Sequence, residues 1–252
     1  MLNELIEGLK SYTGAYSLIS KLKLWNYFWI PVIISALVAC LIFASAYGFS
    51  DNLGLFIAKA WPWEWASETI NTVSEWLSGF IILVVGIILY KHIVLALAAP
   101  FMGVVSEKIE AHLLGETNHI HKHSSSINLL FRGIRINLRN LMMELLLSVP
   151  FTILSFIPGV NLFTTAILFL IQSYYAGFGN MDYTLERHLS YRKSIAFVRQ
   201  HRGLAIGNGM IFMFLLVIPI LGVIIVLPLS AVAATTITLR QLDKQETTLK
   251  TI

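Results

Sequence analysis

Long apolar runs separated by short polar breaks dominate the chain. The first run extends from about Phe28 to Tyr47, and the second from about Gly79 to Ala99. Each run holds roughly the 20 residues that a helix needs to cross the hydrocarbon core of a bilayer. The pattern therefore predicts two long spanning helices, at 28–47 and 79–99.

Two later apolar regions are each interrupted by a short turn signal. Pro158-Gly159-Val160-Asn161 divides region 141–178, and Ile218-Pro219-Ile220-Leu221-Gly222 divides region 207–239. Proline and glycine together mark turns, so each region is predicted to be a helical hairpin with a short tip. Several arms are at or below the roughly 17 to 25 residues of a full span. We therefore expect re-entrant, half-spanning hairpins, and four thin, tilted spans are the alternative.

Residues 1–27 have the pattern of an amphipathic helix. Apolar and polar positions alternate at helical spacing, with Leu2, Leu5, Ile6, Leu9, Tyr12, Thr13 and Tyr16 opposite Glu4, Glu7, Lys10 and Ser17. Such a helix is expected to lie in the membrane interface. Packing of its apolar face against the helix bundle is the equal alternative.

Composition agrees with a membrane protein. Hydrophobic residues make up 56% of the chain and charged residues 13%, and the mean hydropathy is +0.73. These values are more apolar than those of soluble domains. We expect a single all-helical membrane domain over 1–252, ending in a polar tail at 240–252. Cys40 is the only cysteine, which excludes a disulfide within the chain.

Charge is distributed unevenly about these predicted spans. Between the first two spans, acidic residues outnumber Lys59. The other predicted side carries Lys10, Lys21, Lys23, Lys108, Lys122, Arg132, Arg135, Arg139, Arg187, Arg192, Lys193, Arg199, Arg202, Arg240 and Lys244. The positive-inside rule then places both termini in the cytoplasm. Nucleic acid is not an expected partner, because these cations flank bilayer-length apolar runs.

Two charged stripes form the candidate permeation region. Glu107 and Glu110 share a helical face after the second span, and Arg132, Arg135 and Arg139 share another before the first hairpin. Guanidinium groups bind oxyanions in a bidentate manner, so the arginines suit an anion path. The acidic stripe would repel an anion unless the arginines pair with it. The alternative is that both stripes face water or lipid headgroups.

The remaining polar segments suggest surface roles. Asp182-Tyr183 and the basic segment Ser190–Gly203 predict a surface helix anchored by cations. His119, His121 and His123 alternate in a loop and lack the spacing of a helical metal site, so no metal site is expected. No catalytic signature occurs in the chain, and we expect neither enzymatic activity nor a cofactor.

Four strings, in this order and spacing, resemble the CysZ-type sulfate permeases. They are AAPFMGVVSEKIEAHLLG ending at Gly115, SFIPGVN at Ser155–Asn161, MDYTLERH at Met181–His188 and VIPILGVIIVLPLSAVAATT at Val217–Thr236. These permeases share a superfamily with eukaryotic etoposide-induced transmembrane proteins. The resemblance implies two spanning helices, two half-penetrating hairpins, homo-oligomers in the bacterial inner membrane, and uptake of sulfate for cysteine synthesis. It also places Glu107, Glu110, Arg132 and Arg135 in the permeation region.

The chain departs from that family at one point. Members suited to sulfate tend to carry a glycine and paired arginines just before the first span, where this chain has Leu24-Trp25-Asn26. Lys21 and Lys23 lie close upstream and can substitute as point charges, without the bidentate fork of arginine. Lys21, Lys23, Trp25 and Asn26 are therefore the candidate anion-binding residues where the pathway opens.

These observations favour a membrane permease or channel-like protein for sulfate or a related oxyanion. Its expected partners are that small anion, membrane lipids and further copies of the chain. One alternative is a non-transporting protein that organises or shapes membranes through its hairpins and interfacial helices. A weaker alternative is a cation-selective pore that uses Glu107 and Glu110.

Overall fold

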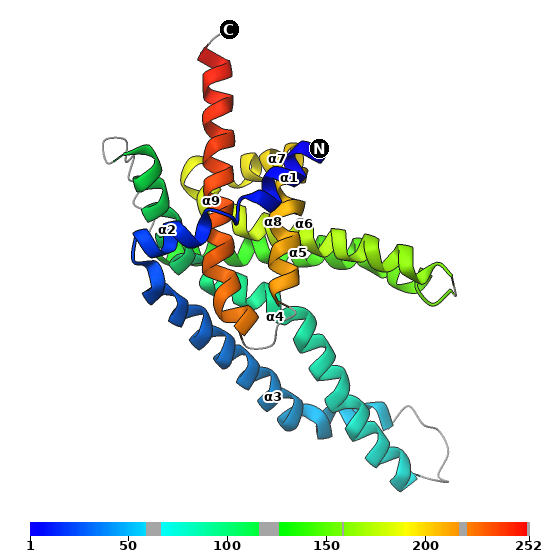
Figure 1. Ribbon diagram of the computed structural model, residues 1–252. Helices are drawn as coiled ribbons and strands as arrows, with labels where there is room; N and C mark the ends of the chain where they lie inside the picture. Colours follow the sequence, from blue (N-terminus) through cyan, green and yellow to red (C-terminus); the bar gives the residue numbers. More distant parts are fainter. Residues whose placement is uncertain (59–66, 116–125, 158, 217–220, 251–252) are drawn as a thin grey trace. The chain divides into compact units, whose positions relative to one another are not determined.

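The computed structural model describes the chain except for residues 59–66, 116–125, 158, 217–220 and 251–252 (Figure 1). All regular structure in the described part is helical, which confirms the predicted all-α class. The elements are α1 (Leu2–Lys10), α2 (Ala15–Lys21), the 3-10 helix η1 (Leu24–Phe28), α3 (Trp29–Ala58), α4 (Ser67–Leu114), α5 (Ser126–Leu154), α6 (Asn161–His188), α7 (Tyr191–Gln200), α8 (Arg202–Leu216) and α9 (Leu221–Lys250).

Contacts within the chain define two compact units. The main unit comprises Met1–Val32 and Leu95–Ile252, and the small unit comprises Ile33–Val94. The unit boundaries fall inside the long helices α3 and α4. The expectation of one membrane domain over the whole chain stays a prediction.

Helices long and apolar enough to cross a membrane are present in the described part. Four segments meet this condition: Leu24–Phe56, His92–Leu114, Asn161–His188 and Ile225–Lys244. The predicted span at 28–47 begins at the last residue of η1 and continues in α3, and the span at 79–99 lies within α4; both helices extend well beyond those limits. Helix α3 continues to Ala58 because apolar positions persist after Tyr47.

Helix α4 also continues through Pro100, where the sequence predicts an end or a kink. Proline lacks the N–H that would bond the carbonyl four residues earlier, which is that of Ala96. Gly133 of α5 lies against this carbonyl, since a Cβ at that glycine would be 3.2 Å from the Ala96 oxygen. A neighbouring helix thus covers the carbonyl that the proline leaves free, as is common in membrane helices.

The two predicted hairpins correspond to helix pairs that pack together, α5 with α6 and α8 with α9. The first predicted tip lies in the turn before Asn161, where Gly159 has a φ of +88°. Glycine adopts this left-handed conformation without strain, which explains its place at the tip. Residues 217–220 of the second predicted tip lie outside the described residues. Whether the hairpins are re-entrant stays a prediction.

Glycines let the helices of the main unit approach to backbone contact. A Cβ at Gly177 of α6 would collide with the carbonyl oxygen of Ala205, and one at Gly209 of α8 with that of Ser173. Helix α1 packs on α8 in the same way, through Gly8. Small residues at such contacts are typical of helix pairs in membranes. The bundle-facing alternative for α1 therefore agrees with its packing, while its depth in the membrane interface stays a prediction.

Behind these contacts lies a core that joins five helices of the main unit. Its buried members are Ile136, Phe178, Met181, Leu185, Phe197, Val198, Leu204, Ala205, Ala234 and Ile237. The hydroxyl of Tyr12 donates a hydrogen bond to the carbonyl of Asn208 at 3.0 Å, and burial raises the pKa of this phenol. The N-terminal segment is thus attached to α8 by a donor that stays protonated.

The glycine contacts generate the first prediction. We expect Gly209→Ala to lower the stability of the detergent-solubilised protein by about 1–3 kcal/mol, because the added methyl group overpacks the contact between α6 and α8. The matched control is Gly48→Ala, where a Cβ would meet no heavy atom within 4 Å. Thermal unfolding measures both variants. Equal melting temperatures for the two would contradict the close approach.

Candidate functional site: a buried polar cluster at the end of α6

The last two turns of α6 carry polar side chains into the interior of the main unit. Asp182, Thr184 and Glu186 are buried there. The helix ends at His188, where Leu189 turns the backbone to an extended conformation. Arg187 and His188 occupy the final turn, where the helix dipole favours cations. We call these residues, with their partners on α4, α5 and α9, the polar cluster.

Arg187 joins α6 to the candidate residue Glu110 of α4. Its Nη2 and Nε atoms donate to Oε2 of Glu110 at 2.7 and 3.0 Å, and Nε2 of His188 lies 2.8 Å from Oε1. The guanidinium also donates to the carbonyls of Gly103 and Tyr183 and to Oγ of Ser106. Both oxygens of Glu110 are therefore engaged by groups that favour its ionised form.

Arg132 forms a second pair of the same kind with Asp182. Its Nη2 and Nε atoms donate to the two carboxylate oxygens at 2.9 and 3.3 Å, which is bidentate geometry. It also donates to the carbonyl of Leu189 at 3.1 Å and to Oγ of Ser194 at 2.9 Å. This one side chain of α5 thus connects the end of α6 to α7.

Three buried hydroxyl groups complete the cluster. Oγ of Ser106 on α4 lies 2.9 Å from Oγ1 of Thr184 on α6 and 2.8 Å from Oγ1 of Thr235 on α9. The two threonine oxygens are 3.1 Å apart. Because Ser106 also accepts from Arg187, the hydroxyl groups and the first ion pair form one connected network. Each buried polar group in it is satisfied, as a low-dielectric interior requires.

Glu186 differs from its neighbours. Its Oε1 atom is buried and has no hydrogen-bond partner within the described part of the chain. The oxygen faces α4 at Gly103, where a Cβ would be 2.7 Å away. The side chain lies in the field of Asp182 and of both cluster arginines. A buried acceptor without a donor is costly, so this carboxyl is the point of the cluster where a proton or a donor group would bind most readily.

The structure brings two of the five predicted path residues, Glu110 and Arg132, into this cluster. Arg135 instead stacks on the Tyr191 ring at 4.2 Å, and Arg139 lies 5.4 Å from the ring centre of Phe178. Glu107 is half-buried on α4. The acidic stripe would repel an anion unless the arginine stripe paired with it, but Glu110 and Arg132 each pair with α6 instead. A role of all five residues in permeation stays a prediction.

Three acidic or arginine residues of the cluster were not proposed as site residues from the sequence: Asp182, Glu186 and Arg187. The interpretation of Asp182-Tyr183 as part of a surface helix is wrong, because both side chains are buried and the Tyr183 hydroxyl donates to the carbonyl of Leu95. Two acids four positions apart, followed by an arginine, share one region of an otherwise apolar helix. That spacing is the signal that points to a buried ion-pair site.

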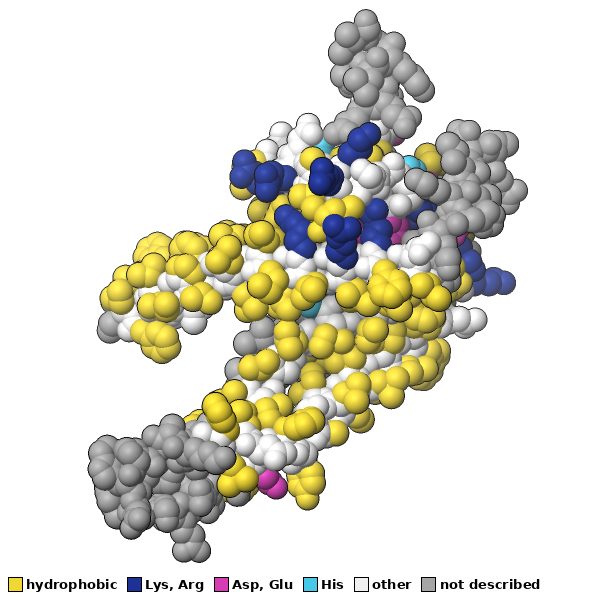
Figure 2. Space-filling model, turned by 180° about the vertical axis from the view of Figure 1, so that it is seen from behind, with side chains coloured by type: hydrophobic (Ala, Val, Ile, Leu, Met, Phe, Trp, Pro, Cys, Tyr) yellow, Lys and Arg dark blue, Asp and Glu magenta, His cyan; other side chains and the backbone are white. Residues whose placement is uncertain are grey.

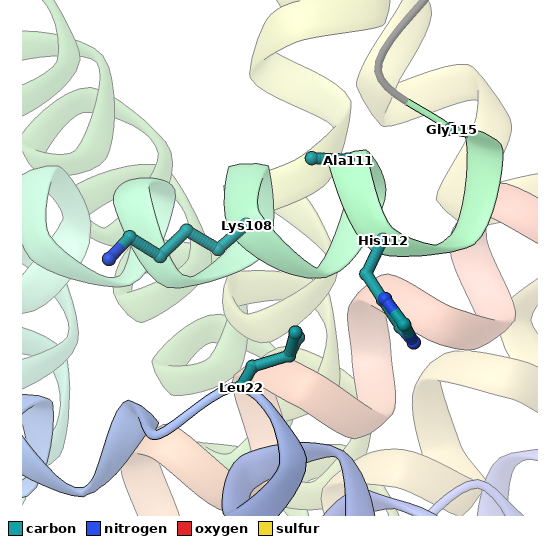
Figure 3. A pocket seen from close by; sticks show the side chains of 5 residues that line it. All are labelled: Leu22, Lys108, Ala111, His112 and Gly115. Atoms are coloured by element: carbon teal, nitrogen blue, oxygen red, sulfur yellow. The ribbon is translucent and has the colours of Figure 1, made fainter.

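The candidate anion-binding residues lie elsewhere, at the connection from α2 to η1. Lys21, Lys23, Trp25 and Asn26 are all exposed there. Between the two lysines, Leu22 lines a pocket of about 430 Å³ together with Lys108, Ala111, His112 and Gly115. Figure 3 shows Leu22 below α4, with Lys108 and His112 on either side. We call this the access pocket; Lys108 is part of its lining, and Lys21 and Lys23 are the sequence neighbours of Leu22.

Metal ligands do not assemble in the part of the chain that the structure describes. No group of three or more His, Cys, Asp or Glu side chains there could hold a metal ion. His119, His121 and His123 lie outside the described residues.

The buried ion pairs generate the second prediction. We expect Asp182→Ala to lower stability by about 3–5 kcal/mol, because it leaves the largely buried Arg132 without its counter-ion. The double variant Arg132→Met/Asp182→Leu should recover much of this loss, since it removes both charges and keeps the volume.

The control is the exposed pair of Glu7 and Lys244, whose charged atoms are 3.9 Å apart. We expect Glu7→Ala to cost less than about 1 kcal/mol, since exposed pairs contribute little. Thermal unfolding in detergent measures all variants. A double variant no more stable than Asp182→Ala would contradict the pairing.

Comparison with known proteins adds an independent finding. The profile of the family described as "Sulfate transporter CysZ/Etoposide-induced protein 2.4" matches residues 12–226. A "Sulfate transporter CysZ" of Pseudomonas aeruginosa (strain LESB58) is 25% identical over 189 residues, covering 70% of this chain and 76% of the relative. One of Pseudomonas fluorescens (strain Pf0-1) is 27% identical over 189 residues, covering 70% and 75%. The sequence resemblance to this family is thus confirmed.

Proposed function

Because the chain belongs to the family described as "Sulfate transporter CysZ/Etoposide-induced protein 2.4", we propose that it is a permease or channel-like protein for sulfate or a related oxyanion. It would act in the bacterial inner membrane, with both termini in the cytoplasm and as a homo-oligomer, and supply sulfate for cysteine synthesis. The named sulfate transporters that resemble most of its length support the substrate class. Its apolar helices support the membrane location.

The access pocket is the observation that best supports an anion as cargo. Lys21 and Lys23 flank Leu22, and Lys108 and His112 come from α4 across the pocket. The volume of about 430 Å³ far exceeds the space of one water molecule, so a tetrahedral oxyanion with part of its hydration shell fits. Lysine is a strongly hydrated point charge. It therefore suits a site that attracts an anion and releases it again.

The polar cluster supports a second step. In the structure, the guanidinium groups of Arg132 and Arg187 are occupied by Asp182 and Glu110. An oxyanion that reaches these arginines would take the place of the carboxylate. The guanidinium group would then keep its hydrogen-bond acceptors during the exchange. We propose that such an exchange carries the anion past α4, α5 and α6. The pairing also neutralises Glu110, whose charge would otherwise repel the cargo.

Radiolabelled sulfate uptake into proteoliposomes tests the proposal. We expect the wild-type protein to raise sulfate permeability well above that of empty liposomes. The variant Lys21→Gln/Lys23→Gln should lower the initial rate about tenfold at low sulfate, because it removes the charges that concentrate the anion at the pocket. Raising the sulfate concentration should restore much of the rate.

The matched control is Lys10→Gln/Arg240→Gln, which removes two exposed charges of the main unit away from the pocket. This control should keep the wild-type rate. Sulfate permeability equal to that of empty liposomes would reject transport, and vesicle deformation without flux would favour the membrane-organising alternative. Equal rates for the two double variants would reject the role of the access pocket in anion capture, but not transport itself.

A further inference from the structure

Three arginines from three helices lie near one tyrosine of α6. Arg139 belongs to α5 and lies 5.4 Å from the centre of the Phe178 ring. Arg199 of α7 and Arg202 of α8 lie next to Val198 and close to Leu204, which pack in the same core as Phe178 and Tyr174. The Tyr174 ring is T-shaped to Phe178, with ring centres 6.4 Å apart, and packs against the core of the main unit. The packed helices therefore hold the three cations in one place. None of these three arginines belongs to the polar cluster or the access pocket.

The cations of this group are not neutralised by ion pairs. Arg132 and Arg187 each hold a carboxylate, whereas Arg139, Arg199 and Arg202 form no salt bridge within the described residues. Arg139 donates to Oδ1 of Asn140, a neutral group, at 3.0 Å.

Two acidic residues lie near this region: Glu4 of α1 pairs with His201, which precedes Arg202, and Glu144 of α5 lies near Tyr175. Glu144 is buried, whereas Arg199 and Arg202 are exposed. Three arginines lie near two carboxylates, one of which already pairs with His201, so positive charge is in excess.

Next to the cations lies an exposed apolar stripe of α5. Leu138, Met142 and Leu146 are 57%, 60% and 68% exposed and follow one another at intervals of four residues, so they share one face of the helix. Leu138 directly precedes Arg139. In Figure 2 the projecting apolar arm is the α5–α6 hairpin, and Lys and Arg side chains gather at its base. The cations thus lie beside an apolar surface. In a phospholipid, the phosphate group lies beside the acyl chains in the same way.

We propose that Arg139, Arg199 and Arg202 bind the headgroup phosphate of an anionic phospholipid, whose acyl chains lie along Leu138, Met142 and Leu146. Arginine matches phosphate oxygens in a bidentate manner, and tyrosine is favoured at the level of the headgroups. Basic pockets between membrane helices are known to bind such lipids. A free sulfate or phosphate ion would leave the apolar stripe unused. The bound lipid would hold α5, α7 and α8 together at the base of the hairpin.

Thermal unfolding of the full-length protein in detergent, titrated with defined lipids, tests this site. Because a ligand of the folded state stabilises it by mass action, phosphatidylglycerol should raise the melting temperature, and phosphatidylcholine with the same chains should not. Glycerol 3-phosphate and inorganic phosphate, which carry the charge without the chains, should also leave it unchanged.

The variant Arg199→Gln/Arg202→Gln removes two exposed cations of the site. We expect it to bind phosphatidylglycerol about tenfold more weakly or worse, measured as the lipid concentration for half of the maximal shift. The control Lys10→Gln/Arg240→Gln removes the same amount of charge at two exposed positions outside the three arginines, and it should keep the wild-type value.

Equal shifts with the two lipids, or an unchanged response in Arg199→Gln/Arg202→Gln, would overturn the proposal. A full shift with glycerol 3-phosphate or inorganic phosphate would also overturn it, because the site would then recognise a soluble anion. Native mass spectrometry provides an independent measurement. The wild-type protein should retain phosphatidylglycerol after detergent removal, and the double variant should lose it.

Discussion

Two carboxylates, the buried Asp182 and the largely buried Glu110, determine how the main unit is put together. Asp182 and Glu110 lie among apolar helices, where an ionised group without a partner is strongly unfavourable. Arg132 and Arg187 neutralise them and use most of their remaining N–H groups on backbone carbonyls and hydroxyl groups of neighbouring helices. The ion pairs and hydrogen bonds of these two arginines consequently hold the helices α4, α5, α6 and α7 together. Apolar packing alone provides little specificity in a lipid environment.

The ion pairs can form only because the helices approach closely. Gly103 on α4 leaves room for Oε1 of Glu186, and Gly177 and Gly209 let α6 and α8 come into backbone contact. A side chain at Gly177 or Gly209 would meet the backbone of the other helix and separate α6 from α8, whereas one at Gly103 would displace the Glu186 carboxyl group. Small residues therefore set the helix distances of the bundle in which the charged residues pair.

Much of this fold could be predicted from the sequence, whereas the site could be predicted only in part. Apolar runs and the Pro/Gly tip at Gly159 identified the helices, because hydrophobic periodicity and turn chemistry are local properties. The first predicted helix ended too early, at Tyr47, because the helix continues after the most apolar stretch ends. Arg132 and Glu110 were identified as candidates, but their partners Asp182 and Arg187 were not. Partner choice depends on which helix faces meet, and that is a tertiary property.

The access pocket and the polar cluster can have different roles, because the lysines beside the pocket are exposed whereas the arginines of the cluster are paired with carboxylates. A guanidinium that already has two carboxylate hydrogen bonds has little attraction left for a distant anion, so Arg132 and Arg187 cannot serve as the first point of capture. The exposed lysines beside Leu22 can attract an anion from solution, so they can serve as the first point of capture. Once an anion arrives at the cluster, exchange of partners requires that a displaced carboxylate find a proton or another donor. Glu186, with one buried oxygen already lacking a donor, shows that this region tolerates such an incompletely satisfied carboxyl. An anion pathway through this chain would therefore be governed by how readily the carboxyl groups of Glu110 on α4 and Asp182 on α6 change partners, more than by the number of arginines along it.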